Sequence, residues 1–254
     1  MENNNTGILS VMNSISSVRN IDIKELPTQG YFYPKDFIIS IKKATFEDIL
    51  EYNFNYIKDD LAAIIFETKR IIKNNVITNY SYKDIKSNDI LYIFFEIVKF
   101  TMDRDILISY VDFDKTVINV PFGSETFDYF DYKSLGCKYD KKSREFISDD
   151  YKFSLPSVGV ENCVIDYIYK MDIMGEQNDY NYDFLFFLGN KNHLSNKEIE
   201  NLITIFNYEM NSMESSRISK IVLNLSNSIP YSLKTKHGVI SLDHLKIDFE
   251  RLFI

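Results

Sequence analysis

The spacing of apolar residues changes twice along this chain of 254 residues, and those changes limit the folds that it can adopt. Residues 21–105 begin with short extended segments and continue with the spacing of amphipathic helices. Residues 106–153 alternate apolar with polar side chains and are rich in β-branched residues, which is typical of antiparallel strands. Residues 154–254 return to helical spacing and finish with a hairpin pattern, whereas residues 1–20 are polar and predict a flexible segment. We therefore expect an α+β protein built from these four segments.

A turn between two short extended runs is the first element that the sequence predicts. Residues 21–26 alternate before Pro27, and residues 37–42 form the second run. Proline presets φ at the turn, and Gly30 supplies the positive φ that such a turn requires. Because Pro34 restricts the backbone on the other side, we expect a rigid loop that joins the strands of an N-terminal β-hairpin.

Capping signals mark the expected helices. A hydroxyl residue followed three positions later by an acidic residue can satisfy the free N–H groups at a helix N-terminus. In the N-terminal half, these signals and a pair of acidic residues predict helices that begin near Thr45, at Asp59–Asp60 and at Ser87, the second ending at Asn74–Asn75 and the third being the most apolar. In the C-terminal half, helices are expected over 157–174, after the Ser195 capping box and over 213–225, with a buried apolar run over 182–188.

The central region contains two pairs of strand signals. The first pair is 106–111 and 116–120, and the second is 127–135 and 144–147, around a charged turn at 139–142. Together they predict a central antiparallel β insertion. The chain is expected to close with a further β-hairpin that has a glycine at its turn.

Composition excludes several classes of protein. The net charge of −8 and the pI near 5.0 argue against sequence-independent nucleic-acid binding, which needs clustered basic residues. The apolar runs are too short to span a bilayer, and the N-terminus lacks the apolar core of a secretory signal. Two cysteines, Cys137 and Cys163, are too few for a disulfide scaffold, although they could pair. We expect reduced thiols in a cytoplasmic protein, unless it leaves the cell in a particle.

The sequence predicts no catalytic, cofactor-binding or metal site. Its three histidines do not have the spacing of zinc ligands, and there is no glycine-rich phosphate loop and no nucleophile elbow. The alternative is a metal-dependent hydrolase or nuclease that uses Asp103, Asp105, Asp112 and Asp114, because clustered carboxylates can bind a divalent cation. That alternative requires the four acids to converge in a cleft, whereas aspartates at turns ordinarily face solvent.

The most distinctive phrase is Glu25-Leu26-Pro27-Thr28-Gln29-Gly30-Tyr31-Phe32-Tyr33-Pro34, followed by the alternating run 39–42 and by Ala44-Thr45-Phe46-Glu47-Asp48. It resembles the start of the baseplate hub proteins of T-even-like contractile-tailed bacteriophages, which begin with a Leu-Pro-Ser-x-Gly-x-x-Tyr-Pro phrase, a short strand and a capped helix. Residues 195–254 are similar to the end of that family. Many of its members carry a Cys-x-x-Cys-Gly turn where this chain has Thr235-Lys236-His237-Gly238, so no structural zinc is expected.

This resemblance implies a non-enzymatic baseplate hub component or hub assembly factor. Its partners would be other phage tail and baseplate hub proteins, and it would be found in the virion or in the host cytoplasm during assembly. Within the phrase, we expect a protein-interaction site, because aromatic side chains on a rigid loop are effective interface anchors. Its candidate residues are Pro27, Gly30, Tyr31, Phe32, Tyr33 and Pro34. In the alternative interpretation, the aromatic rings pack the hairpin onto the adjacent helices.

Overall fold

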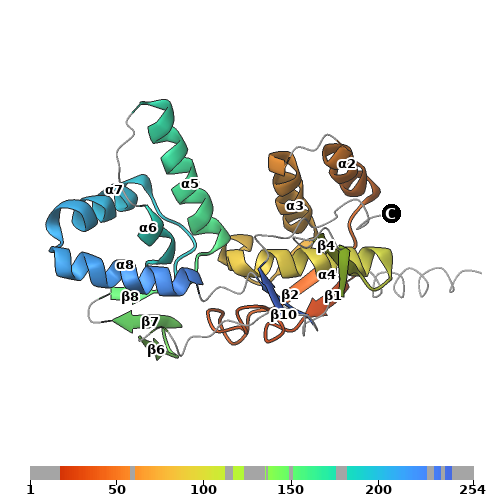
Figure 1. Cartoon of the computed structure of the whole chain (residues 1–254), viewed down its shortest axis with the longest axis horizontal. Helices are drawn as coiled ribbons and strands as arrows, with labels where there is room; N and C mark the ends of the chain where they lie inside the picture. Colours follow the sequence, from red (N-terminus) through yellow and green to blue (C-terminus); the bar gives the residue numbers. More distant parts are fainter. Residues whose placement is uncertain are drawn as a thin grey trace, which may run out of the picture.

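The computed structural model describes residues 18–57, 61–111, 117–122, 135, 137–148, 151–175, 182–227, 232–235 and 238–241. Helices and antiparallel sheets are both present, which confirms the predicted α+β class. The elements form two lobes that lie side by side (Figure 1). The N-terminal lobe contains the first helices and sheet, and the C-terminal lobe contains the helices from residue 158 onward with a second sheet.

The N-terminal sheet has three antiparallel strands in the order β1-β2-β3. These are β1 (Val18–Ile21), β2 (Ile39–Lys42) and β3 (Val76–Thr78). The first strand lies earlier than predicted, because Asp22 turns the chain: its carboxylate accepts from the Lys24 N–H at 2.9 Å. Residues 18–20 of the segment expected to be flexible therefore form a strand, and the rest of that segment lies outside the described residues.

The three N-terminal helices are α2 (Phe46–Ile57), α3 (Leu61–Asn75) and α4 (Ile90–Met102). The cap at Thr45 is confirmed: its hydroxyl accepts from the Asp48 N–H at 3.1 Å, and the Asp48 carboxylate accepts from the Thr45 N–H at 3.0 Å. The end of the second helix at Asn75 is also confirmed, whereas Asp59 and Asp60 lie outside the described residues. Helix α4 packs against α3 and β2 in the middle of the lobe (Figure 1).

The predicted cap at Ser87 is wrong. Residues Ser87–Asp89 form a 3-10 turn, which follows a similar turn at Tyr82–Asp84, and the helix begins after it. The Ser87 hydroxyl instead donates to Glu161 at 2.7 Å. The prediction that this helix belongs to the core is confirmed, since seven consecutive residues from Tyr92 to Val98 are buried.

The central β residues form two separate sheets. One is the hairpin of β4 (Leu107–Val111) and β5 (Val117–Pro121), and the other joins β6 (Lys138–Asp140), β7 (Glu145–Ser148) and β8 (Tyr151–Phe153). The charged turn lies between β6 and β7, as predicted. Phe122, which follows β5, packs in the core of the N-terminal lobe, whereas Phe146 and Phe153 pack in that of the C-terminal lobe. Residues 127–134 of the remaining expected strand lie outside the described residues.

The C-terminal helices follow the predicted order. They are α5 (Val158–Ile173), α6 (Asp183–Phe187), α7 (Asn196–Thr204) and α8 (Ser212–Asn227), with a π-helical turn at Ile205–Glu209. The expected capping box at Ser195 is confirmed, because Ser195 forms it reciprocally with Glu198. The structure adds a cap at Ser157, whose hydroxyl accepts from the Val160 N–H. The last hairpin is also confirmed: β9 (Ser232–Thr235) pairs with β10 (Gly238–Ser241).

Each lobe has its own hydrophobic core. The first core contains most of α4 together with strand residues such as Ile39 and Ile41. The second core joins α5–α8 to the β6–β8 sheet, and it also contains Phe32 from the N-terminal phrase. None of the helices in the described ranges has both the length and the apolar content needed to cross a bilayer.

Gly159, in the first turn of α5, is tightly packed against residues of both lobes. A Cβ placed on Gly159 would overlap the Asn192 carbonyl oxygen and lie 2.8 Å from the Cβ of Lys83, which belongs to the N-terminal lobe. We expect Gly159→Ala to lower the free energy of unfolding by about 3 kcal/mol in urea titrations, because backbone must move to accept it. Helix propensity alone would favour alanine by about 1 kcal/mol, so the sign of the change isolates the clash.

Gly175→Ala is the matched control. No atom lies within 4 Å of the position that a methyl group would take there, and only its φ of +70° opposes the change, at a cost of about 1 kcal/mol. Equal losses for the two variants would contradict the tight packing at Gly159.

Candidate functional site

The residues of the candidate site form a compact series of turns between β1 and β2. The Gln29 N–H donates to the Leu26 carbonyl at 2.7 Å, and the Tyr31 N–H donates to the Thr28 carbonyl at 3.1 Å. Gly30 has a φ of +75°, which confirms the predicted left-handed glycine, and Gln29 also has a positive φ. The phrase is thus a defined turn structure whose side chains are held by its own backbone.

A buried carboxylate holds this loop. Asp89, at the start of α4, accepts from the Thr28 N–H at 3.0 Å, from the Thr28 hydroxyl at 2.7 Å and from the Tyr33 hydroxyl at 2.7 Å. The Tyr33 hydroxyl in turn accepts from the Lys86 N–H at 2.9 Å. Burial raises the pKa of Asp89 to about 6, against the hydrogen bonds from Thr28 and Tyr33, which lower it. Burial and the neighbouring Asp89 also raise the pKa of Tyr33 well above its usual value.

Lys86 extends the network into the C-terminal lobe. Its ammonium donates to the Ser154 hydroxyl, to the Leu155 carbonyl and to the Asn190 side chain, at 3.2, 3.0 and 2.7 Å. It also lies 5.5 Å from the centre of the Phe32 ring. Burial lowers the pKa of this lysine to about 7, because the charged form loses its hydration. Asn190 completes the link by donating to the Phe32 carbonyl at 3.2 Å.

The structure divides the predicted interface residues into a buried and a half-buried group. Phe32 and Tyr33 are 2% and 3% exposed, and Phe32 makes an edge contact with Phe146 in the second core. This burial favours the packing alternative over the interface alternative for these two rings. Tyr31 is half-buried against Tyr139 in an edge arrangement, and the Tyr139 hydroxyl donates to its carbonyl. Of the remaining candidates, Pro27 is buried, and Gly30 and Pro34 are half-buried.

Among the described residues, the acids of the enzymatic alternative form no metal cluster. Asp103 and Asp105 are exposed at the end of α4, and Asp105 pairs with Lys99 at 3.1 Å. Asp112 and Asp114 lie outside the described residues. Within the described ranges, no three histidine, cysteine or acidic residues could hold a metal ion together.

The two cysteines and one of the histidines lie in the described part of the chain. Cys137 and Cys163 are free thiols, and Cys163 lies 3.2 Å from the Nδ1 of the exposed His193. His237 and His244 lie outside the described residues.

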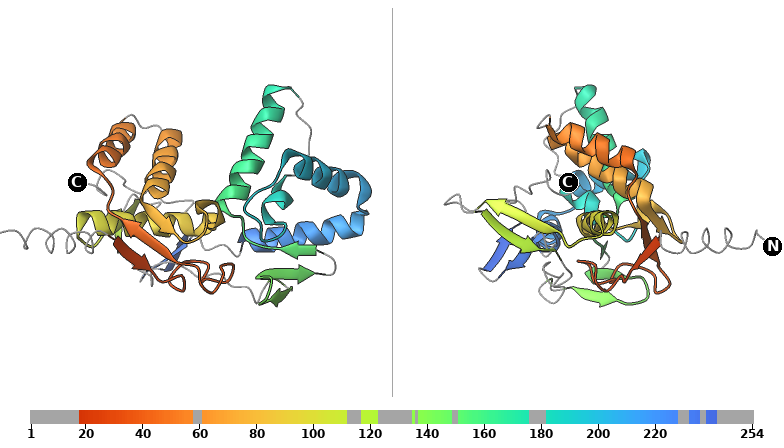
Figure 2. Two further views of the ribbon diagram at one scale, coloured as in Figure 1. Left: turned by 180° about the vertical axis from the view of Figure 1, so that it is seen from behind. Right: turned by 90° about the vertical axis from the view of Figure 1, so that its right-hand side faces the viewer.

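Helix α5 carries apolar side chains on two faces, and sequence reasoning identified only the inner one. Val160, Val164 and Tyr167 pack in the second core. Ile165, Tyr169 and Ile173 form a second stripe, four residues apart, and are 45%, 66% and 67% exposed. The helix projects beyond the rest of its lobe (Figure 2). Because the three side chains are exposed, this outer stripe is available to another protein. The sequence signal for the outer stripe is its four-residue spacing of apolar side chains, on a helix that has another apolar face for the core.

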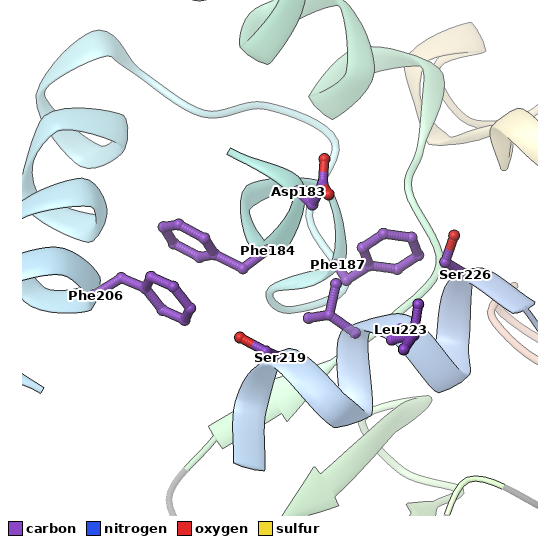
Figure 3. A pocket seen from close by; sticks show the side chains of 8 residues that line it. Asp183, Phe184, Phe187, Phe206, Ser219, Leu223 and Ser226 are labelled. Atoms are coloured by element: carbon purple, nitrogen blue, oxygen red, sulfur yellow. The ribbon is translucent and has the colours of Figure 1, made fainter. Parts of the chain in front are cut away.

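The second apolar feature of the C-terminal lobe is a cavity at the second core. A cavity of about 370 Å³ opens between α6 and α8, and its lining includes Phe184, Phe187, Phe206 and Leu223 (Figure 3). Phe184 and Phe206 are stacked with their ring centres 4.0 Å apart. The π-helical turn brings Phe206 to this position, so the cavity is a local hollow in the second core.

Comparisons with family models, curated proteins and solved structures find no match to this chain.

The tyrosine at the centre of the network provides a prediction. Tyr33→Phe removes a hydroxyl that donates to the buried Asp89 and accepts from the Lys86 N–H. We expect the free energy of unfolding to fall by about 3 kcal/mol, because both groups would be left short of a partner away from water. Denaturant titrations at unchanged slope would measure this loss.

Tyr80→Phe is its control. The Tyr80 hydroxyl also bonds to an aspartate, Asp36, but Tyr80 is 41% exposed. Water can replace that bond, so a change within about 0.5 kcal/mol is expected. Equal effects of the two substitutions would argue against a buried network.

The buried lysine predicts a pH dependence of stability. The folded pKa of Lys86 is lowered from 10.5 to about 7, so the unfolded chain binds more protons throughout that interval. The contribution of Lys86 to stability is thus present above the unfolded pKa and is lost as the pH falls through about 7. We expect the difference in unfolding free energy between the wild type and Lys86→Met to shift in favour of the wild type as the pH rises through this interval, by up to about 1.4 kcal/mol per pH unit.

Asp89 affects the free energy of unfolding in the opposite direction, and it does so in a lower pH interval. Its folded pKa is raised from 3.8 to about 6, so its contribution to stability falls as the pH rises through that range.

Lys83→Met, which removes an exposed lysine three residues before Lys86, is the control for the Lys86 measurement. A pH-independent difference for Lys86→Met would show that its ammonium does not titrate as described.

Proposed function

We propose that this chain is a non-enzymatic component of the baseplate hub of a contractile phage tail, or an assembly factor of that hub. It acts through protein–protein interfaces with other tail and baseplate proteins, in the virion or in the host cytoplasm during assembly. The resemblance of the phrase from Glu25 to Pro34 to baseplate hub proteins supports this family of partners.

The observation that carries the proposal is the outer stripe of α5. Three large apolar side chains, Ile165, Tyr169 and Ile173, are exposed on one face of a projecting helix. Burying such a side chain against a partner contributes about 1.5–3 kcal/mol, and tyrosine is among the residues that most often dominate an interface. A helix with this face suits a groove or a second helix on a neighbouring protein.

The central phrase supports the proposal in a different way. It holds the two lobes through buried polar contacts and Phe32, so that the α5 stripe belongs to a preorganised scaffold. A preorganised surface loses less conformational entropy when it docks into an assembly.

The test is an infection in which this chain carries an affinity tag and the co-purifying proteins are identified by quantitative mass spectrometry. We expect tail and baseplate proteins to be recovered, either from purified particles or from assembly intermediates. Recovery from particles would identify a hub component, and recovery from intermediates alone would identify an assembly factor. Recovery of neither would contradict the proposal.

Tyr169→Ala then tests the α5 stripe. Loss of a contact worth about 1 kcal/mol lowers partner recovery by at least about fivefold, without a change in the melting temperature of the isolated chain. Tyr208→Ala is the matched control, because Tyr208 is 68% exposed, like Tyr169 at 66%, but lies on the π-helical turn. If both variants retained their partners, the interface would lie elsewhere.

A further inference from the structure

A small cavity lies between the two lobes, beside the buried network. Its volume is about 130 Å³. The N-terminal lobe contributes aromatic and polar residues to its wall, and the C-terminal lobe contributes Arg144, Asn190 and Lys191. Phe37 and Tyr80 form one side as a stacked pair, with ring centres 5.2 Å apart. The cavity therefore combines an apolar wall with basic groups from the opposite lobe.

Most polar groups that line this cavity already have partners. Tyr33 donates to Asp89, Tyr80 to Asp36, and the Lys191 ammonium pairs with Glu198 at 3.1 Å. The Asp84 carboxylate accepts from the Ser81 N–H and from the Asn192 side chain.

Arg144 differs from these residues. Its Nε is buried and has no hydrogen-bond partner, and within the described part of the chain no carboxylate lies at ion-pair distance from its guanidinium. Its backbone has a φ of +59°, in the left-handed region that is unfavourable for a residue with a Cβ. The turn between β6 and β7 thus holds a cation in the cavity wall at some cost in backbone energy.

Lys86, which also lines the cavity, likewise has no anionic partner in direct contact among the residues that the structure describes. The three acceptors of its ammonium are a hydroxyl, a carbonyl and an amide oxygen. Burial lowers the pKa of Lys86, the nearby carboxylates of Asp89 and Asp84 raise it, and the guanidinium of Arg144 is close enough to lower it again. An anion in the cavity would interact favourably with both groups.

We propose that this interlobe cavity binds a carboxylate, with the guanidinium of Arg144 as its principal donor. A guanidinium fork matches the two oxygens of a carboxylate, and the buried Nε–H of Arg144 would gain its missing acceptor. The volume exceeds several times the roughly 30 Å³ that one water occupies in the liquid, so a carboxylate with a short methylene stem fits. The stem would lie against Phe37 and Tyr80. The site is independent of the baseplate assignment.

Two sources can provide such a group: a free small carboxylate, or an aspartate side chain of another protein. NMR titration of the full chain with acetate, with N-acetyl-aspartate N-methylamide and with the neutral asparagine analogue distinguishes them, at constant ionic strength set with chloride. The signals followed are the Nε–H of Arg144 and the side-chain amide of Asn190. We expect saturable shifts with both carboxylates and none with the asparagine compound.

The relative affinities then identify the source. Binding of the capped aspartate at least about tenfold tighter than acetate assigns the site to a protein partner, and equal binding assigns it to free carboxylates. Arg144→Gln should weaken binding at least about tenfold, as followed on the Asn190 signals. Arg104→Gln, which removes an exposed arginine of the N-terminal lobe, should leave it unchanged.

Three results would overturn the proposal. They are the absence of a saturable shift of the Arg144 signal in the wild-type chain, equal binding by the asparagine compound, and equal affinities of the wild type and Arg144→Gln. The first of these uses no variant, so it decides the question even if the substitution disturbs the β6–β7 turn.

Discussion

The carboxylate of Asp89 is the group on which the arrangement of the N-terminal lobe depends. It is fully buried, and an ionised carboxylate in such a place is destabilising unless several donors surround it. Thr28 and Tyr33 supply three donors, and the position of Asp89 at the N-terminus of α4 adds the favourable field of the helix. The result is that the loop between β1 and β2 is bound to the helix at the centre of the first core.

The same loop connects the two lobes. Tyr33 faces Asp89 in the first core, while its neighbour Phe32 enters the second core against Phe146. Adjacent side chains in an extended or turning segment can point to opposite sides, and here each side is a different lobe. Lys86 makes the reciprocal connection, from the N-terminal lobe to Ser154, Leu155 and Asn190. Polar and aromatic contacts thus set the relative position of the two cores, together with the packing of α5 against Lys83 and Ser87 of the N-terminal lobe.

In this fold several polar groups are buried and several large apolar side chains are exposed, which is the reverse of the usual distribution. A carboxylate, an ammonium and a phenol are buried in the network of Asp89, Lys86 and Tyr33, whereas large apolar side chains are exposed along α5. Buried polar groups contribute less to stability than apolar packing of similar size, but they specify one arrangement because alternatives leave them without partners. A specified scaffold with an exposed apolar helix suits a protein that acts through its surfaces, in agreement with the proposed role in a baseplate hub.

The sequence by itself determined the local elements of this protein. The caps at Thr45 and Ser195 and the left-handed Gly30 could be predicted, because each depends only on residues within the same short segment. The α+β class followed from the change in apolar spacing. Ser87 was assigned the wrong partner because it bonds to Glu161, which is 74 residues away, and not to its own helix.

Only the tertiary structure decided which of these elements meet. Thr28 and Asp89 are 61 residues apart, and the carbonyl of Phe32 meets an amide 158 residues further along the chain. No spacing rule reaches over such distances, because the contact depends on how both cores pack and not on the intervening sequence. The same holds for the aromatic phrase, whose rings could equally have been exposed anchors, and for α5, whose second apolar stripe became a surface because no element of the described chain covers it.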